Sequence, residues 1–195
     1  MNDRRAELTR KTKEVETSCR LNLDGTGKTA ISTGIGFLDH MLNLLAYHAG
    51  FDIELTCKGD LEIDDHHSVE ECALLLGAAL NQALGDRQGV ARFGWAMVPM
   101  DEALASAAVD LSGRPYSRIQ LGLQREKLGQ LSCELIPHAL SSIAAAARLT
   151  LHVEVSHGEN DHHKAEAAFK SFALALRQAV KSDGSQQIPS TKGTL

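Results

Sequence analysis

The feature that most constrains the fold of this chain is an internal repeat. The motif Asp-His-His-x-x-Glu occurs at residues 65–70 and again at 161–166, an offset of 96 residues. Both copies are followed by a segment rich in alanine and leucine that has helical character. A repeat of this kind predicts two similar halves within one chain, so each motif has to be counted twice.

Two further pairs of segments occur in the same order in both halves. In the first pair, a histidine leads into an apolar helical segment, and in the second a strand-like segment ends at a glycine. The second alignment also places Glu14 opposite Glu102. Three blocks in one order predict a duplicated half-domain, with half-repeats at 1–92 and 93–195 joined in one compact unit. The additional paired segments are 37–42 with 135–140 and 21–25 with 109–113.

Hydropathy patterns predict the same order of elements, β-β-α-β-α, in each half. Alternation of apolar and polar residues indicates half-buried strands, and apolar stripes at helical spacing indicate helices. Asp65 and Asp161 stand where an N-cap is expected, at the start of the last helix of each half. Strands are expected within 12–23, 51–55, 104–111 and 149–155, and helices within 40–48, 66–84, 138–147 and 162–180.

Helices that cover one face of each sheet would bury these apolar stripes. The pattern therefore predicts an α+β fold in which two mixed sheets have the helices packed between them. The chain has 195 residues and is 43% hydrophobic, which is enough for a sizeable core.

Composition and charge argue against several classes of partner. A formal net charge of −5 gives no electrostatic reason to expect nucleic acid or an anionic membrane. No apolar run approaches the roughly 18 residues that a membrane helix requires. The charged segment 1–16 contains no signal peptide, so we expect a cytoplasmic protein. The four cysteines are scattered without C-x-x-C spacing and are expected to be reduced and mostly buried.

The repeated motif has the spacing of a metal site. Residues four apart on a helix are separated by about 40° around its axis, so His66 and Glu70 can bind one ion, as can their counterparts His162 and Glu166. Adjacent residues diverge by about 100°. His67 and His163 are therefore expected to reach other ions than their neighbours do.

The ligand count predicts two sites of three imidazoles and one carboxylate. We favour one ion bound by His66, Glu70 and His163, and another bound by His162, Glu166 and His67. His40 and His138 complete these sites in an order that the sequence leaves open. Such ligands suit Mn, Fe, Co or Zn. Because the paired imidazoles diverge, we expect the ions to lie between chains of a homo-oligomer.

Over nearly its whole length, from about residue 10 to residue 195, the chain resembles the monofunctional imidazoleglycerol-phosphate dehydratases. The resemblance implies a fold like the second domain of ribosomal protein S5, a manganese cofactor with two ions per active site, and an assembly of twenty-four subunits with active sites at interfaces. The segments that carry it are Gly-Phe-Leu-Asp-His-Met-Leu at 36–42, Asp-His-His-Ser-Val-Glu-Glu at 65–71, Asp-Leu-Ser-Gly-Arg-Pro at 110–115, Asp-His-His-Lys-Ala-Glu at 161–166 and Pro-Ser-Thr-Lys-Gly at 189–193.

The implied reaction is the dehydration of imidazoleglycerol phosphate to imidazoleacetol phosphate in histidine biosynthesis. The proton to be removed lies on a carbon beside the imidazole ring, and two metals on the two ring nitrogens would stabilise an imidazolate that expels the neighbouring hydroxyl. Glu14 is the proton-transfer residue that the family pattern suggests, with Glu166 or Glu70 as partners. Glu102, the repeat counterpart of Glu14, could do similar work.

The phosphate group of such a substrate requires cationic and hydroxyl donors. Lys170 lies one turn after Glu166 on the same helical face and can reach the same site. The composition of residues 181–195 is typical of a disordered tail, whereas the resemblance implies that this tail orders over substrate. The candidate phosphate ligands are Arg92, Arg114, Lys170, Ser190 and Lys192.

Two other functions use similar ligands. A dinuclear metallohydrolase would also combine histidine and glutamate, but the chain has neither an Asp-rich bridging pattern nor an H-E-x-x-H helix. In a metal-storage or metal-assembled structural protein, the candidate phosphate ligands would have no purpose. Affinity for a phosphate ester separates these classes.

Overall fold

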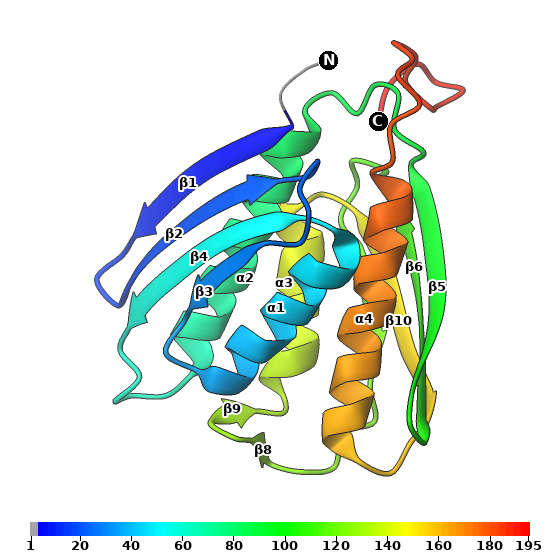
Figure 1. Cartoon of the computed structure of the whole chain (residues 1–195). Helices are drawn as coiled ribbons and strands as arrows, with labels where there is room; N and C mark the ends of the chain where they lie inside the picture. The colour runs from blue at the N-terminus through cyan, green and yellow to red at the C-terminus, as the bar shows by residue number, and fades with distance from the viewer. Residues whose placement is uncertain (1–3) are drawn as a thin grey trace.

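The computed structural model describes residues 4–195 and contains two mixed four-stranded sheets with helices between them (Figure 1). Residues 1–3, which belong to the expected first half-repeat and to the segment tested for a signal peptide, lie outside the described residues. The elements are β1 (Arg5–Lys11), β2 (Val15–Asn22), β3 (Thr29–Ser32), α1 (Gly36–Ala49), β4 (Asp52–Gly59), α2 (His66–Leu84), β5 (Phe93–Met100), β6 (Ala103–Asp110), β7 (Tyr116–Gln120), β8 (Lys127–Leu128), β9 (Leu131–Ser132), α3 (Leu135–Ala146), β10 (Thr150–His157) and α4 (Asp161–Ala179).

The two sheets have the same connectivity. The strand order is β1-β2-β4-β3 in the first and β5-β6-β10-β7 in the second. In each sheet the first two pairings are antiparallel and the last pairing is parallel, so both sheets are mixed. The predicted α+β class with two mixed sheets is confirmed.

Each half contains one strand more than the sequence predicted. None of the expected ranges covers the edge strands, which are β1 and β3 in the first sheet and β5 and β7 in the second. Most of their residues are exposed or only half-buried, so these strands lack the fully buried face that would produce a clear apolar alternation. The short β8–β9 hairpin was also not predicted.

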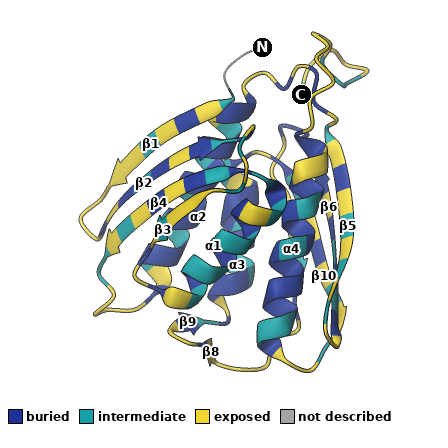
Figure 2. Cartoon of the chain, in the orientation of Figure 1, coloured by how far each residue is buried: buried dark blue, intermediate teal, exposed yellow. Residues whose placement is uncertain are grey.

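The helices form the layer between the sheets. α1 and α2 pack on the first sheet, α3 and α4 pack on the second, and the helices contact one another in the pairs α1–α4 and α2–α3. Strand β2 alternates strictly between buried and less buried residues, as a strand covered on one face should. Helix α4 is buried along most of its length, and Phe169 and Phe172 lie fully inside the core (Figure 2). One hydrophobic core therefore unites both halves.

All four helices begin at the same end of the molecule, opposite the end where the chain termini lie (Figure 1). Two helices begin a turn earlier than predicted. α1 begins at Gly36, after an N-cap residue, Ile35, that makes no side-chain cap bond. α3 begins at Leu135 and includes Pro137 in its first turn, where the missing N–H of proline costs no helical hydrogen bond.

A glycine sets the close approach of α2 to α3. A β-carbon at Gly77 would lie 2.5 Å from the carbonyl oxygen of Ile143 and 2.8 Å from Cβ of Ala146. Only a residue without a side chain fits here, so Gly77 allows the two helices to pack with their backbones almost in contact. This packing brings their N-terminal turns together.

Candidate metal centre and substrate site

Two imidazoles and a carboxylate converge where the N-terminal turns of α1 and α4 meet. Nε2 of His40 lies 2.8 Å from Oε1 of Glu166, and Nε2 of His162 lies 3.0 Å from the same oxygen. Their candidate ligand atoms all lie within 4.8 Å of one another. We call these three residues the α1–α4 group.

A second set of the same composition lies between α2 and α3. Nε2 of His138 is 3.2 Å from Oε1 of Glu70, and the ring centroids of His66 and His138 are 5.3 Å apart. The candidate ligand atoms again lie within 4.8 Å of one another. We call His66, Glu70 and His138 the α2–α3 group. It is more exposed than the α1–α4 group, in which Glu166 is buried.

Each group combines both halves of the chain. In both, a helix from one half provides the i, i+4 pair of histidine and glutamate, and a helix from the other half provides the third residue. The sequence left the placement of two histidines open. The structure places His40 beside the α4 pair and His138 beside the α2 pair.

His67 and His163 point to other partners, as the helical angle predicted. Nδ1 of His67 lies 3.1 and 3.3 Å from the carboxylate oxygens of Asp60, and Nδ1 of His163 lies 2.7 Å from Oε2 of Glu102. Within one chain, the structure brings neither histidine into the three-residue group that we favoured for it.

These carboxylates change the pKa values of the two imidazoles. The hydrogen bond to Asp60 raises the pKa of His67, and the hydrogen bond to Glu102 raises the pKa of His163. In turn, the backbone N–H of Asn160 and the imidazole of His163 lower the pKa of Glu102 to about 2. The carboxylate of Glu102 is therefore ionised at neutral pH and can only accept hydrogen bonds.

Glu166 is the most strongly bonded carboxylate of the α1–α4 group. Burial raises its pKa, but the hydrogen bonds from Lys170, His40 and His162 outweigh this effect and lower the pKa to about 2. The predicted position of Lys170 on the same face of the helix as Glu166 agrees with this ion pair. Nζ of Lys170 also lies 3.3 Å from the sulfur of Met100.

The predicted N-cap position is confirmed for Asp65 and wrong for Asp161. Asp65 occupies the N-cap position of α2 without a side-chain cap bond, and Asp161 is already the first residue of α4. The side chains that accept a hydrogen bond from the first turn are Asp64 and Asn160, at 2.9 Å from the N–H two residues ahead. The N-cap of α4 is thus one residue earlier than predicted, whereas in α2 the residue before the N-cap accepts the hydrogen bond.

Asp65 and Asp161 are both buried, and their carboxylates stabilise the loops around the site. The carboxylate of Asp65 accepts hydrogen bonds from the N–H (2.6 Å) and Oγ (2.9 Å) of Ser132 in the other half. Asp161 accepts the backbone N–H groups of residues 124 and 125, and it pairs with Nζ of Lys164 at 2.9 Å. Buried carboxylates need several donors, and tertiary contacts provide more of them than a cap would.

Glu14 lies in the turn between β1 and β2. Its side chain is 56% exposed, and one carboxylate oxygen lies 3.9 Å from Nε2 of His67. It belongs to neither three-residue group of its own chain. Glu102, its counterpart in the repeat, occupies the turn between β5 and β6 and bonds to His163.

The candidate phosphate ligands, apart from Lys170, lie at the opposite end of the helices from the two groups. The backbone N–H of Arg92 donates to the carbonyl oxygen of Ala179, the last residue of α4, whereas His162 is in the first turn of this helix. At 1.5 Å per residue these positions are about 25 Å apart. Arg114 follows β6 at the end where Asp110 pairs with Phe93, next to Arg92.

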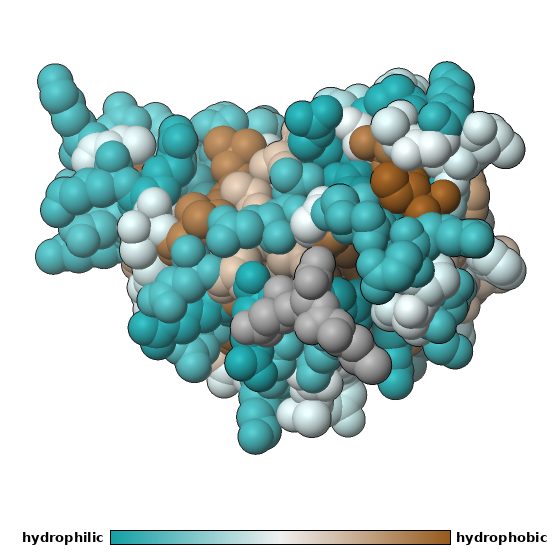
Figure 3. All heavy atoms as spheres, turned by 90° about the horizontal axis from the view of Figure 1, so that it is seen from above, coloured by the Kyte–Doolittle hydropathy of each residue, from teal (hydrophilic) through white to brown (hydrophobic). Residues whose placement is uncertain are grey.

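The tail is attached to this same end of the molecule. The guanidinium of Arg92 bonds to the carboxylate of Asp110 at 2.7 Å and to the carbonyl oxygen of Pro189 at 2.8 Å. Gly89 exchanges backbone hydrogen bonds with the tail as well. The segment that carries Ser190 and Lys192 therefore lies beside Arg92. Seen from above, this end is largely hydrophilic, with separate hydrophobic patches (Figure 3).

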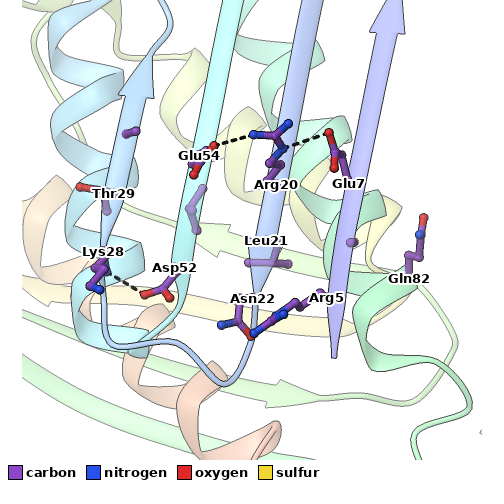
Figure 4. Close-up of a pocket in the computed structure, with 13 residues that line it drawn as sticks. Arg5, Glu7, Arg20, Leu21, Asn22, Lys28, Thr29, Asp52, Glu54 and Gln82 are labelled. Carbon is purple, nitrogen blue, oxygen red and sulfur yellow. Dashed lines mark hydrogen bonds and ion pairs between the residues drawn. The ribbon is translucent and has the colours of Figure 1, made fainter. Parts of the chain in front are cut away.

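A pocket of about 630 Å³ lies away from all of these residues, over the sheet β1-β2-β4-β3 (Figure 4). On this face, Arg20 lies between two carboxylates, 2.9 Å from Glu7 and 3.2 Å from Glu54. None of the predicted site residues lines the pocket.

Asp60 is a residue near the site that the sequence analysis missed. It directly follows β4 and bonds to His67. A search for it would have started from the rule that a metal-binding histidine usually donates its second ring N–H to a carboxylate. The six residues between Asp60 and His67 gave no sign of the contact, because it depends on the turn between β4 and α2.

Comparisons with known proteins agree on one family. The model of the family described as imidazoleglycerol-phosphate dehydratase matches residues 33–176. The imidazoleglycerol-phosphate dehydratase of Chloroherpeton thalassium is 50% identical over 195 residues, which is 100% of both chains. That of Phytophthora nicotianae is 59% identical over 98% of this chain, but the chain spans only 42% of its length.

A solved structure supports the same relationship. The crystal structure of IGPD from Pyrococcus furiosus superposes with a TM-score of 0.84 at 36% identity, covering 96% of this chain and 100% of that one. Glu14, Ser190 and Lys192 lie outside residues 33–176 but inside the full-length match to the Chloroherpeton thalassium enzyme.

Among residues 4–195, no helix is both long enough and apolar enough to cross a membrane.

Proposed function

This chain belongs to the imidazoleglycerol-phosphate dehydratase family, and we propose that it is the hydro-lyase that converts imidazoleglycerol phosphate into imidazoleacetol phosphate in histidine biosynthesis. The observation that carries the proposal is the pair of matched groups, one between α1 and α4 and the other between α2 and α3. Two cations would bind the two nitrogens of the substrate ring, and the two groups have the same composition, as a pair of such sites would.

The donor atoms of both groups fit manganese. Each combines two imidazole nitrogens with one carboxylate oxygen and no thiolate, a set that suits Mn and its neighbours rather than a soft ion. We propose two manganese ions per active site. When bound, they would act as Lewis acids that stabilise the imidazolate form of the substrate ring.

Glu14 is the residue that we propose for proton transfer. Its carboxylate is exposed and lies beside His67, so it can approach a substrate bound near that imidazole. Glu166 is less suited to accept a proton, since its carboxylate is paired with Nζ of Lys170 and would also bind a cation with His40 and His162. The carboxylate of Glu70 lies 3.2 Å from Nε2 of His138 and would likewise be a metal ligand.

We further propose that the complete active site forms between subunits, in an assembly of twenty-four. The distance along α4 separates Arg92, Arg114, Ser190 and Lys192 from the candidate metal ligands, and one small substrate cannot span about 25 Å. His67 and His163 would complete sites of neighbouring subunits. Three exposed apolar side chains on the outer face of β5 are typical of a surface that packs in an assembly: Phe93, Trp95 and Met97.

The shared connectivity of the two sheets supports a gene duplication, with half-repeats at 1–92 and 93–195. Each repeat would be a β-β-β-α-β-α unit. Since each three-residue group contains residues of both repeats, neither repeat would hold a metal alone.

We propose the cytoplasm as the location of the enzyme.

An activity assay tests this function directly. The purified protein is loaded with manganese and supplied with imidazoleglycerol phosphate, and the enolised ketone product is followed by ultraviolet absorbance. We expect turnover that is lost in a chelator and restored by manganese. A protein that contains manganese but forms no ketone would contradict the proposed function.

A further inference from the structure

We infer that Asp60 and Glu102 are positioning residues that hold His67 and His163 in the tautomer and orientation needed to bind a cation through Nε2. The inference rests on the proposed function, because that function makes the two histidines metal ligands. Asp60 and Glu102 lie outside the proposed ligand set and would act through the imidazoles that they contact.

In the first half, Asp60 is held close to α2. It is the first residue after β4, its side chain is 19% exposed, and its carboxylate lies 3.1 and 3.3 Å from Nδ1 of His67. The exposed Glu14 lies instead toward Nε2 of the same ring, at 3.9 Å. The two ring nitrogens of His67 thus face different carboxylates, of which that of Asp60 is half-buried and that of Glu14 is exposed.

In the second half, Glu102 makes the equivalent contact and is fixed more firmly. Its Oε2 lies 2.7 Å from Nδ1 of His163. Its other oxygen accepts the backbone N–H groups of Glu159, at 3.1 Å, and Asn160, at 2.8 Å, directly before α4. The carboxylate therefore holds the imidazole against the start of the helix that carries it.

The two carboxylates do not occupy equivalent positions of the repeat. The residue 96 positions after Asp60 is Ser156, which lies within β10, while the first-half counterpart of Glu102 is Glu14. Each half thus brings a carboxylate to the same ring nitrogen by a different route. If duplication had only copied the contact, the two carboxylates would occupy equivalent positions of the repeat. Because they do not, we infer that both imidazoles need a carboxylate at Nδ1.

The chemistry of the contact identifies that requirement. An ionised carboxylate can only accept a hydrogen bond, so Nδ1 has to carry the proton, and a neutral imidazole then has its lone pair on Nε2. Metal-binding histidines commonly donate their second N–H to a carboxylate in this way, which fixes the ring and increases its basicity. Asp60 and Glu102 are placed to do so for His67 and His163.

Amide substitutions test the inference with little change in shape. In Asp60→Asn and Glu102→Gln, the new NH₂ group can donate to Nδ1 and favours the tautomer that carries its proton on Nε2, which cannot bind a cation. The metal-free variants are titrated with manganese against a chromophoric chelator, without substrate. We expect about 10- to 100-fold weaker manganese affinity in each variant.

Two exposed glutamates provide matched controls. Glu62 lies in the same loop as Asp60, and Glu159 lies in the same loop as Asn160. Glu62→Gln and Glu159→Gln remove the same charge and should leave manganese affinity unchanged. Affinities of Asp60→Asn and Glu102→Gln within twofold of the parent protein would overturn the inference while leaving the proposed function intact. A parent protein that binds no manganese would overturn the proposed function itself.

A double-mutant cycle separates positioning from a merely structural role. If Glu102 acts through His163, then Glu102→Gln should cause no further loss of manganese affinity when His163 is already alanine. A loss of the same size in both backgrounds would mean that Glu102 only supports the loop before α4, and it would overturn the inference for this residue. Thermal unfolding of every variant shows whether the fold is retained.

Discussion

At the scale of single residues, the position of Glu14 allows catalysis to be separated from metal binding. Because Glu14 is exposed and lies outside both three-residue groups, Glu14→Gln should leave manganese content and stability unchanged. Loss of its proton transfer should lower kcat by about 100- to 10,000-fold. The measurements are steady-state kinetics and metal content of the same preparation, and unchanged turnover would remove Glu14 from the mechanism.

The raised pKa values of His67 and His163 predict a pH dependence of the metal-free protein. Since both values lie above the ordinary 6.5 when the protein is folded, protonation stabilises the fold. This stabilisation is complete below the ordinary pKa and is lost as pH rises through the raised pKa. It should be absent when both histidines are glutamine.

The comparison of the two proteins is made by denaturant unfolding in a chelator, from about pH 6 to about pH 8.5. The free energy of unfolding of the parent protein, minus that of the His67→Gln/His163→Gln variant, should decrease as pH rises. A difference that stays constant or increases would show that Asp60 and Glu102 do not favour the protonated imidazoles.

At the scale of elements, the packing of α2 on α3 predicts a sensitive glycine. The β-carbon of Gly77→Ala would collide with the backbone of α3, so the helices would separate and the unfolding free energy should fall by about 1–3 kcal/mol. Manganese binding to the α2–α3 group should weaken as well. The matched control is Gly36→Ala in α1, where a β-carbon meets nothing within 4 Å.

For Gly36→Ala we expect no loss of stability and a gain of up to about 1 kcal/mol, since alanine restricts the unfolded chain. Denaturant titration and manganese stoichiometry compare the two variants. If Gly77→Ala is as stable as its control and binds as much manganese, then close packing of α2 and α3 is not what holds His138 beside Glu70.

The elements that the sequence predicted are those with one buried face. Strand β2 and helix α4 carry an apolar pattern because one side of each contacts the core. The edge strands β3 and β7 lack this pattern since they are largely exposed, and the true start of α1 is not marked in the sequence because Ile35 provides no capping side chain. The edge strands and the start of α1 depend on pairing and packing with distant parts of the chain, so the local sequence did not predict them.

In the candidate site, the sequence predicted the contacts within one helix but not those between helices. The i, i+4 spacing gave the pairs of histidine and glutamate on α2 and α4, because helix geometry alone decides which residues share a face. The allocation of His40 and His138 required the tertiary pairing of the helices, and so did the contacts of Asp65 and Asp161. Such contacts join residues far apart in the chain, for which the motif spacing carries no information.

At the scale of the whole molecule, we predict that metal holds the proposed assembly together. If His67 and His163 bind ions of neighbouring subunits, then removal of manganese by a chelator should convert the proposed assembly of twenty-four into smaller species, and manganese should restore it. Size-exclusion chromatography with light scattering measures the mass in both states. A metal-free sample that keeps its full mass would show that protein contacts alone are sufficient.

The central claim is that the α1–α4 and α2–α3 groups bind two ions in each subunit. Anomalous diffraction from crystals grown with manganese, recorded above and below the manganese absorption edge, tests it most directly. We predict two anomalous peaks per subunit, one beside His40, His162 and Glu166 and the other beside His66, Glu70 and His138. Diffraction that shows no peak at either group, or manganese only at other places, would contradict the claim.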